Sequence, residues 1–294
     1  MATTSSAGEH PEHTNQTDAG KPAGGQVPDS LLRPSSARIY DYLLGGGHHY
    51  AIDREFADQQ KEILPDIGHA VRSNRAFTGR ALRYAFGAGI RQVVDIGSGL
   101  PSPGQAHDIA DTECPGLGVR VVYVDNEPIA HAHSDVLLGA GTDPDRHAAV
   151  FGDYFDADGL WQTIVDTGAI DPAEPTCLLV TAVLHFMPPA TRPDAALRRY
   201  RELLAPGSML VLTHGSLAEG DTAGHTVAAN YIHTTNQDTV SRTAAELTEF
   251  FGDFDLVDPG VVWTVQWHPP PEDTPWWGDT PGRARYLAGV AVKP

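Results

Sequence analysis

Arg91-Gln-Val-Val-Asp-Ile-Gly-Ser-Gly-Leu100 predicts a buried strand that runs directly into a glycine-rich turn. The apolar run ends at Asp95, and Gly97 and Gly99 follow at once. A buried parallel strand is typically a continuous β-branched run, and glycines after it let the backbone turn tightly and approach a ligand. We therefore expect a ligand site at the carboxyl end of this strand.

A second stretch, Arg120-Val-Val-Tyr-Val-Asp125, repeats this pattern, because an apolar strand again ends in a carboxylate. In a doubly wound sheet the carboxyl ends of neighbouring strands meet at one edge. Asp95 and Asp125 are therefore expected to lie close together. Two acids in this arrangement are typical of a site for a nucleoside-like cofactor.

The rest of the chain alternates strands and helices, which predicts a mostly parallel sheet with helices on both faces. Further parallel strands are expected at 147–151, 176–183 and 208–213. Two closing strands, at 255–263 and 284–292, indicate an antiparallel edge. The expected fold class is α/β, a doubly wound Rossmann-like sheet of the methyltransferase type.

Three segments are expected along the 294 residues. Residues 1–29 lack hydrophobic periodicity and carry few large apolar residues, which predicts a disordered tail. Residues 30–88 place apolar side chains at helical spacing and predict a helical cap. Residues 89–294 form the expected cofactor-binding domain, and for this length one shared core is favoured over two separate domains.

The net charge narrows the range of partners. It is −18, from 38 acidic and 20 basic residues. Such a surface repels nucleic-acid phosphates, so DNA or RNA is not expected as a partner. A nucleotide-sized ligand is still compatible with this charge, because it needs only a local site.

Cysteine spacing and hydropathy narrow the classes of protein further. The two cysteines, Cys114 and Cys177, do not form a C-x-x-C pair, and no cluster of residues is typical of metal ligands, so no metal is expected. No apolar run is long enough to cross a membrane, and the first residues lack the apolar region of a signal peptide. We therefore expect no membrane partner and a cytoplasmic location.

The glycine-rich turn departs from the dinucleotide fingerprint G-x-G-x-x-G/A, because Ser102 occupies the last position and Pro101 interferes with a helix that starts at once. No G-K-[S/T] follows a strand, so the sequence contains no P-loop. An acid followed by alternating glycines fits the methyltransferase pattern, with Pro101 in place of the usual third glycine. S-adenosylmethionine has no pyrophosphate, so the turn favours this cofactor. A tight turn without a ligand is the alternative.

Residues that follow the other strands complete the expected adenosine site. Asp125 is placed to accept hydrogen bonds from two ribose hydroxyls, or to cap the next helix. Asp153 offers a carboxylate for the adenine amino group and Tyr154 an aromatic wall, with a turn beside a core aromatic residue as the alternative. The predicted cofactor-binding residues are Asp95, Gly97, Ser98, Gly99, Asp125, Asn126, Asp153, Tyr154 and Thr181.

The methyl-transfer site is expected at the end of the fourth strand, where His185 could act as a general base. A buried structural histidine is the alternative. In the cap, three glycines precede His48, His49 and Tyr50, and they predict either a lid or a helix end followed by a turn. The predicted catalytic residues are His185, Tyr40 and Asp41, although Tyr40 could instead pack the cap on the sheet. The predicted substrate-cleft residues are His48, Tyr50 and Arg54.

Six motifs are specific in combination. They are Ala37-Arg-Ile-Tyr-Asp-Tyr-Leu-Leu-Gly-Gly-Gly47, Asp53-Arg-Glu55, Asn74-Arg-Ala-Phe77, Val94-Asp-Ile-Gly-Ser-Gly-Leu-Pro101, Val122-Tyr-Val-Asp-Asn126 and Ala182-Val-Leu-His-Phe186. Together they resemble a bacterial family of S-adenosylmethionine-dependent methyltransferases. The resemblance implies a class I methyltransferase fold whose N-terminal helical cap carries the Tyr-Asp-Tyr-Leu-Leu-Gly-Gly element. It also implies that Leu100-Pro101 is the family's own form of the turn.

The leading hypothesis is an S-adenosylmethionine-dependent methyltransferase that acts on a small-molecule acceptor. A second hypothesis is a non-catalytic S-adenosylmethionine-binding protein with a regulatory role. A third is an NAD(P)-dependent oxidoreductase, which Ser102 and the closing strands disfavour. Neither the sequence nor the resemblance defines the methyl acceptor.

Overall fold

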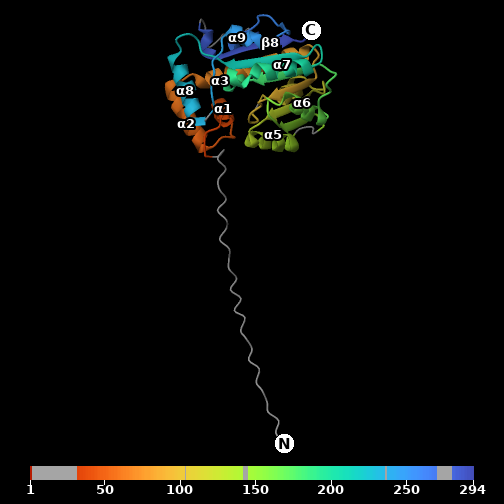
Figure 1. Ribbon diagram of the computed structural model, residues 1–294, viewed down its shortest axis with the longest axis horizontal. Helices are drawn as coiled ribbons and strands as arrows, with labels where there is room; N and C mark the ends of the chain where they lie inside the picture. The colour runs from red at the N-terminus through yellow and green to blue at the C-terminus, as the bar shows by residue number, and fades with distance from the viewer. Residues whose placement is uncertain (2–31, 103, 142–144, 236, 270–279) are drawn as a thin grey trace.

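A mostly parallel sheet forms the centre of the computed structural model (Figure 1), which describes residues 1, 32–102, 104–141, 145–235, 237–269 and 280–294. The expected tail at 2–29 lies outside the described residues. The strands are β1 (Gln92–Ile96), β2 (Arg120–Asp125), β3 (His147–Phe151), β4 (Thr176–Thr181), β5 (Met209–Gly215), β6 (Asp255–Leu256), β7 (Val262–Trp263) and β8 (Tyr286–Val292). Their order in the sheet is β3-β2-β1-β4-β5-β8-β6, and β7 also pairs with β8.

Strand direction confirms the doubly wound topology with an antiparallel edge. The first five strands are parallel, and β1 pairs with both β2 and β4, so the winding direction reverses beside β1. β8 runs antiparallel to β5. The strand expected at 255–263 is instead two short strands, because Pro259 has no N–H to donate and Gly260 turns the chain with φ +83°.

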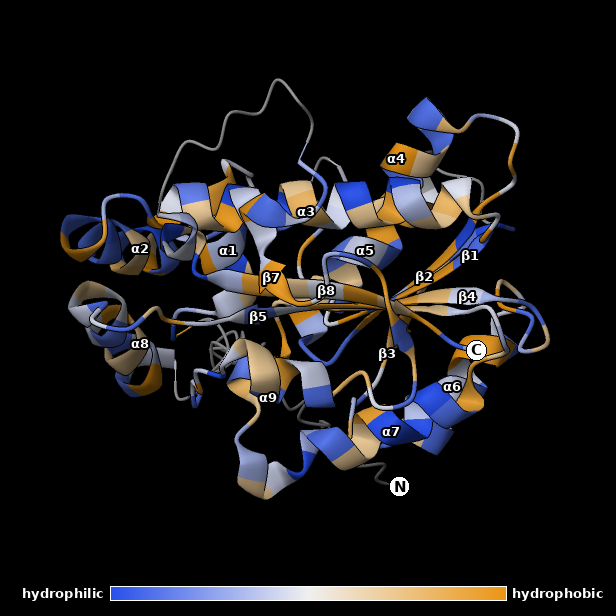
Figure 2. Ribbon diagram, turned by 90° about the horizontal axis from the view of Figure 1, so that it is seen from above, coloured by the Kyte–Doolittle hydropathy of each residue, from blue (hydrophilic) through white to orange (hydrophobic). Residues whose placement is uncertain are grey.

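Each face of the sheet carries its own hydrophobic core. Helices cover both faces, as Figure 2 shows. Successive strand residues point to opposite faces, so Val93 and Val121 join one core while Val94 and Val122 join the other. One face is covered by α3 (Ile67–Gly87), α4 (Ala106–Glu113) and α5 (Pro128–Gly141). The opposite face is covered by α6 (Ala157–Asp166), α7 (Pro193–Leu203) and α9 (Ala244–Glu249).

A third core lies at one end of the molecule, beyond the carboxyl ends of the central strands. It joins α1 (Ser36–Leu44) and α2 (Ala51–Ile63) to α8 (Thr222–Thr235), which is distant in sequence (Figures 1 and 2). Val227 of α8 packs in the same cluster as Ile39, Phe56 and Val71. The helical cap is therefore completed by a segment of the sheet domain.

Helix α3 connects the cap to the sheet. Its first turns place Ile67 and Val71 in the cap core, and its later turns place Phe77 and Leu82 in the sheet core. The residues between these two apolar sets lie where cap and sheet meet. This position explains why polar side chains from the middle of α3 reach the site described below.

Among the described residues, no helix combines the length and apolar character needed to cross a bilayer.

Candidate functional site

A cavity of about 600 Å³ opens at the carboxyl ends of the parallel strands. Its walls come from the turns after β1, β2, β3, β4 and β5, from α1, α3 and α8, and from the first residues of β8. This is the position at which open α/β sheets bind ligands, because the winding direction reverses there and leaves a crevice. The sequence predicted this location from Asp95 and Asp125, and both line the cavity.

The turn after β1 requires its glycines. Gly97 and Gly99 adopt φ values of +71° and +65°, which favour glycine. A Cβ on Gly97 would lie 2.3 Å from Cγ2 of Val183. The N–H groups of Gly97 and Ser98 both donate to the carbonyl of Val124, at 2.8 and 3.0 Å. The backbone is therefore pressed between β2 and the segment after β4, with its outer side toward the cavity.

Asp125 holds this turn together. One carboxylate oxygen accepts a hydrogen bond from the N–H of Gly99 at 2.8 Å, and the other accepts from the N–H of Glu127 at 2.8 Å. Burial raises the pKa of Asp125, and these backbone N–H groups oppose the shift. A carboxylate oxygen has two lone pairs, so Asp125 can still accept from a ligand. Neither donor belongs to α5, which begins at Pro128 and whose Ala130 N–H donates to the carboxylate of Glu127. Asp125 therefore braces the turn and does not cap this helix, and its ribose role stays a prediction.

Asp95 is buried at the base of the cavity with unused hydrogen-bonding capacity. Its Oδ1 has no partner among the described residues. Burial raises the pKa of Asp95 to about 7; the Arg75 guanidinium opposes this shift and the Asp125 carboxylate adds to it. A buried acid without a partner is costly, so the site is suited to a ligand that brings a donor or a positive charge.

Helix α3 supplies two cavity-lining residues that the predicted site did not include, Asn74 and Arg75. The amide of Asn74 donates to the hydroxyl of Tyr40 at 2.8 Å, whereas its Oδ1 is buried without a partner. Arg75 donates through Nη2 to Ser102 at 2.9 Å, and its buried Nε has no partner. Ser98 Oγ is buried and unpartnered as well. The motif Asn74-Arg-Ala-Phe77, which carries part of the family resemblance, was the sequence signal that could have identified these two residues.

The geometry of His185 argues against the predicted general-base role. His185 lies in the short helix after β4, and its Nδ1 accepts a hydrogen bond from the N–H of Gly215 at 3.2 Å. In the neutral ring the proton is therefore on Nε2, which is a donor. Burial, with a smaller effect from Arg242, lowers the pKa of His185 to about 3. His185 lines the cavity as a neutral hydrogen-bond donor.

The backbone beside His185 is strained. Ala182 lines the cavity with φ +57°, a region that residues with a side chain rarely adopt. Its N–H donates to the hydroxyl of Thr213 at 2.8 Å, which holds the conformation. Strain of this kind is concentrated at functional sites. The position coincides with the predicted methyl-transfer end of β4, where Thr181 also lines the cavity.

Asp41 organises the loop that Gly45, Gly46 and Gly47 form after α1, which we call the glycine loop. Its Oδ2 accepts from the N–H of His48 at 2.8 Å and lies 3.1 Å from Nδ1 of His49. A Cβ on Gly46 would lie 2.0 Å from Asp41 Oδ1, so the loop wraps tightly around this carboxylate. Asp41 borders the cavity, but its side chain serves the loop. Its Oδ1 has no hydrogen-bond partner among the described residues, and its predicted catalytic role stays a prediction.

The predicted substrate-cleft residues lie outside the cavity wall. Tyr50 is exposed, and its ring stacks under the Arg38 guanidinium at 5.0 Å. Arg54 is an exposed residue of α2. His48 packs its ring against His133 at 4.8 Å and borders a separate, more open pocket together with Arg75. These side chains follow the glycine loop away from the sheet, which the sequence pattern did not reveal.

The residues after β3 divide between the cavity and the solvent. Tyr154 lines the cavity, and its hydroxyl is fixed by donation to the carbonyl of Pro193 at 2.8 Å. Phe155 also borders the cavity, as does the exposed Asn126 after β2. Asp153 is exposed, accepts from the N–H of Phe155 at 3.0 Å and stands outside the cavity wall. Its predicted contact with adenine stays a prediction.

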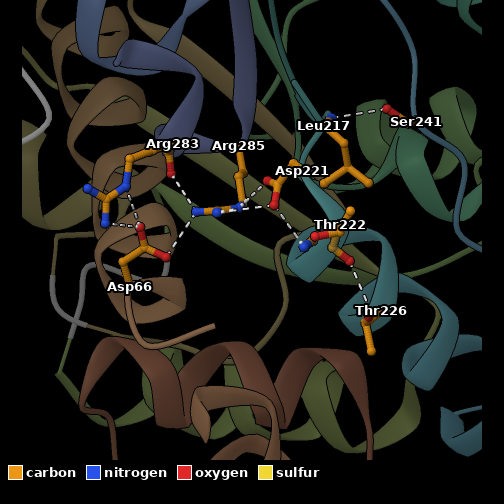
Figure 3. Close-up of polar contacts among 9 residues, drawn as sticks. Asp66, Leu217, Asp221, Thr222, Thr226, Ser241, Arg283 and Arg285 are labelled. Atoms are coloured by element: carbon orange, nitrogen blue, oxygen red, sulfur yellow. Dashed lines mark hydrogen bonds and ion pairs between the residues drawn. The ribbon is translucent and has the colours of Figure 1, made fainter. Parts of the chain in front are cut away.

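An ion-pair network, drawn in Figure 3, lies beside the cavity. Arg285, at the entrance to β8, contacts Asp66 at 3.0 Å and Asp221 at 2.7 Å. Asp66 also pairs with Arg283 at 2.8 Å, and Asp221 accepts from the N–H of Gly224 in the first turn of α8. The network joins the start of α3, the start of α8 and the sheet. Arg285 is the charged residue of this network that lines the cavity, and the two carboxylates neutralise its charge.

Comparison with known proteins matches nearly the whole chain to one family. The sequence profile of a family described as S-adenosyl methyltransferase matches residues 28–294. A crystal structure of a DUF574 family protein from Streptomyces avermitilis is 35% identical, with a TM-score of 0.82 over 90% of this chain and 98% of that chain. A candidate methyltransferase from Thermobifida fusca is 33% identical, with a TM-score of 0.80 over 90% of this chain and 96% of that one.

Curated relatives match over shorter stretches. A protein from Rhodococcus jostii, named as a candidate S-adenosyl-L-methionine-dependent methyltransferase, is 27% identical over 66% of this chain and 61% of its own length. A similarly named protein from Mycolicibacterium smegmatis is 31% identical over 42% of this chain and 38% of its own. The chain thus spans less than two thirds of the length of these relatives.

Proposed function

Because this chain belongs to the S-adenosyl methyltransferase family, we propose that its cavity binds S-adenosyl-L-methionine and that the protein transfers the methyl group to a small-molecule acceptor. The observation that carries this proposal is the set of unpartnered buried polar atoms at one end of the cavity. They are Asn74 Oδ1, Arg75 Nε, Asp95 Oδ1 and Ser98 Oγ. Buried polar atoms normally have partners, so this set indicates a ligand.

These atoms complement the amino-acid end of the cofactor. Asp95 and Asn74 present acceptor oxygens, which suit an α-ammonium group. Arg75 Nε and the Ser98 hydroxyl present donors, which suit an α-carboxylate. One positive and one negative ligand group would satisfy the whole set. A cavity built only for an uncharged ligand would not need both Asp95 and Arg75.

The nucleoside end is assigned to the residues after β2 and β3. Asp125 retains lone pairs for the ribose hydroxyls, and Glu127 Oε1 is buried without a partner beside it. Phe155 and the backbone of Gly152 supply a surface for the adenine ring. We keep Asp153 as the candidate for the adenine amino group, at the open edge of this subsite.

The chain's contribution to catalysis is alignment and exclusion of water. The cofactor, when bound, supplies a methyl group that its sulfonium already activates. The protein must therefore hold an acceptor atom in line with that methyl group, which can supply a large part of the rate enhancement. The strained Ala182 and the neutral His185 form the wall where the transfer is proposed to occur.

Calorimetric titration with S-adenosyl-L-methionine, its demethylated product and NAD tests the cofactor assignment. We expect binding of the first two and none of NAD. Preferential binding of NAD would restore the oxidoreductase hypothesis. Transfer of labelled methyl groups to a panel of acceptors then separates an enzyme from a regulatory protein, because a regulatory protein would bind the cofactor without turnover on any acceptor.

A further inference from the structure

The cavity continues past the proposed cofactor site into a second half with a different chemical character. Its walls are mainly apolar and come from the cap, from α8 and from the segments after β4 and β5. The residues that define it are Leu43, Val71, Phe186, Leu217, Val227 and Val240. We call this region the acceptor half. An apolar region of this kind favours a ligand with an apolar body.

Arg285 and Asp41, which border the acceptor half, already make polar contacts within the protein. Arg285 is paired with Asp66 and Asp221. Asp41 is held by the loop through the N–H of His48 and by the ring of His49. The exposed His225 stands at the rim on α8. Arg285 is therefore not free to pair with a phosphorylated acceptor.

Hydrogen-bond donors are nevertheless gathered there. Tyr231 and Tyr286 line the cavity, and neither hydroxyl makes a hydrogen bond within the described part of the chain. The rings of His185 and Tyr286 lie 6.0 Å apart, and Nε2 of His185 carries a proton. Burial raises the pKa of Tyr286 well above its usual value, and the phenols of Tyr40 and Tyr231 add to this shift. The three phenols therefore stay protonated and lie near one another.

We propose that the methyl acceptor is a small aromatic hydroxy compound that reacts as its oxyanion, with the oxygen held by the hydroxyls of Tyr231 and Tyr286 and by Nε2–H of His185. This inference rests on the proposed function and names its substrate class. The apolar walls receive the aromatic ring, and the donors receive the oxygen. The cofactor's sulfonium supplies the compensating positive charge.

The oxyanion form follows from the lack of a free acceptor on the buried groups beside the proposed oxygen position, whereas the exposed His225 stands only at the rim. Nδ1 of His185 is already used by the N–H of Gly215, and its Nε2 is a donor. A second buried imidazole, His214, receives an N–H of Arg242 on its Nε2 and does not line the cavity. The Asp41 carboxylate faces its own loop. The hydroxyl therefore loses its proton to solvent before transfer.

The transfer step then balances without another reagent. The acceptor oxygen attacks the methyl carbon, and the O–C bond forms as the S–C bond breaks. The electron pair of the broken bond returns to sulfur. The products are an aryl methyl ether and the demethylated cofactor. The negative charge of the oxyanion and the positive charge of the sulfonium have both disappeared.

The pH dependence of kcat/KM across a series of phenols tests this proposal. With saturating cofactor, 4-nitrophenol, 4-hydroxyacetophenone and 4-cresol, in order of decreasing acidity, should give midpoints that follow each compound's own pKa. A single midpoint shared by all three phenols would show that a protein base removes the proton and would overturn the proposal. Loss of that shared midpoint in His225→Gln would identify the base.

Binding measurements supply a readout that does not depend on turnover. In the presence of the demethylated cofactor, Tyr231→Phe and Tyr286→Phe should each weaken 4-nitrophenol binding about ten-fold, with cofactor binding unchanged. Tyr84→Phe is the matched control, because that exposed ring of α3 packs on Trp267 outside the cavity. Unchanged phenol affinity in both cavity variants would contradict the proposed donors.

The two levels of the account can fail separately. Cofactor binding by the wild-type protein, combined with turnover of benzylamine or benzoate and none of the phenols, would overturn the acceptor assignment alone. Absence of S-adenosyl-L-methionine binding would contradict the proposed function, and the acceptor assignment would fall with it.

Discussion

Asp95 connects local electrostatics to ligand binding. Its carboxyl group has a pKa of about 7 in the free protein, above the usual value of 3.8, because it is buried. The proposed contact with the cofactor's ammonium requires the ionised carboxylate. Protonation of Asp95 should therefore compete with cofactor binding in the range in which the group titrates.

We expect the affinity for S-adenosyl-L-methionine to rise with pH up to about 7, by as much as about ten-fold per pH unit. Asp95→Asn should weaken binding at pH 7.5 by about ten-fold or more and remove most of the pH dependence. Calorimetry over this pH range makes the measurement. The exposed Asp194→Asn is the control. An unchanged slope in Asp95→Asn would place the titrating group elsewhere.

Asp125 has two tasks, and a substitution should affect both. Asp125→Ala should weaken cofactor binding by about ten-fold or more, because the proposed ribose contacts are lost. It should also lower the free energy of unfolding by about 1–3 kcal/mol, since the N–H groups of Gly99 and Glu127 lose their acceptor. Calorimetry and urea denaturation measure the two effects. Full cofactor affinity in the variant would refute the ribose assignment.

The sequence predicted the position of a residue best where that residue lies at the end of a strand. Asp95 and Asp125 were found because the chain places them at the carboxyl ends of neighbouring strands. Asn74 and Arg75 were missed as site residues, because only the path of α3 from cap to sheet brings them to the cavity. The hydrogen-bonding role of His185 could not be predicted, because it depends on the N–H of Gly215, which donates to Nδ1 and leaves Nε2 as the donor.

At the scale of elements, the turn after β1 should tolerate almost no side chain. Gly97→Ala adds a Cβ at 2.3 Å from Val183 and keeps a backbone with φ +71°. The φ value alone costs about 1–2 kcal/mol, and the clash adds to it. Gly104→Ala is the matched control, because its φ is +82° but nothing lies within 4 Å of the added Cβ.

Thermal denaturation and cofactor titration of both variants make this comparison. We expect Gly97→Ala to be the less stable variant and the only one with reduced cofactor affinity. Equal losses of stability and of cofactor affinity in the two variants would contradict this expectation. They would mean that the positive φ of Gly97, and not its close approach to Val183, is the reason why glycine is needed there.

The network around Arg285 fixes α8 against the sheet. Arg285→Met leaves the largely buried Asp221 without its ion-pair partner, which should lower the free energy of unfolding by about 3 kcal/mol. Arg283→Met is the control, because the Arg283 side chain is 51% exposed and should contribute at most about 1 kcal/mol. Urea denaturation tests this difference. Equal effects of the two substitutions would show that Arg285 is not the residue that anchors α8.

Element-level prediction was strong for the sheet and weaker for the cap. The apolar runs at β1 to β5 and the closing β8 were predicted, because buried parallel strands have a continuous apolar signature. The pairing of α8 with α1 and α2 was not, since Val227 meets Ile39 and Phe56 only through tertiary packing. The glycine loop also depended on such packing, in this case around Asp41.

At the scale of the whole molecule, the fold separates two tasks around one cavity. The sheet and its turns form the polar end, where Asp95, Asp125 and Arg75 gather. The cap and α8 form the apolar end, which the ion pairs of Arg285 hold in place. We therefore propose that α1, α3 and α8 contribute to substrate choice, because they line the cavity whereas Tyr50 and Arg54 do not.

The central claim is that the unpartnered polar atoms beside the glycine turn hold the amino-acid end of S-adenosyl-L-methionine. A crystal structure with the demethylated cofactor bound tests it most directly. We predict the carboxylate within hydrogen-bonding distance of Arg75, the ammonium within that distance of Asp95, and the ribose at Asp125. A cofactor bound in another orientation, with Asp95 and Arg75 still unpartnered, would contradict the account.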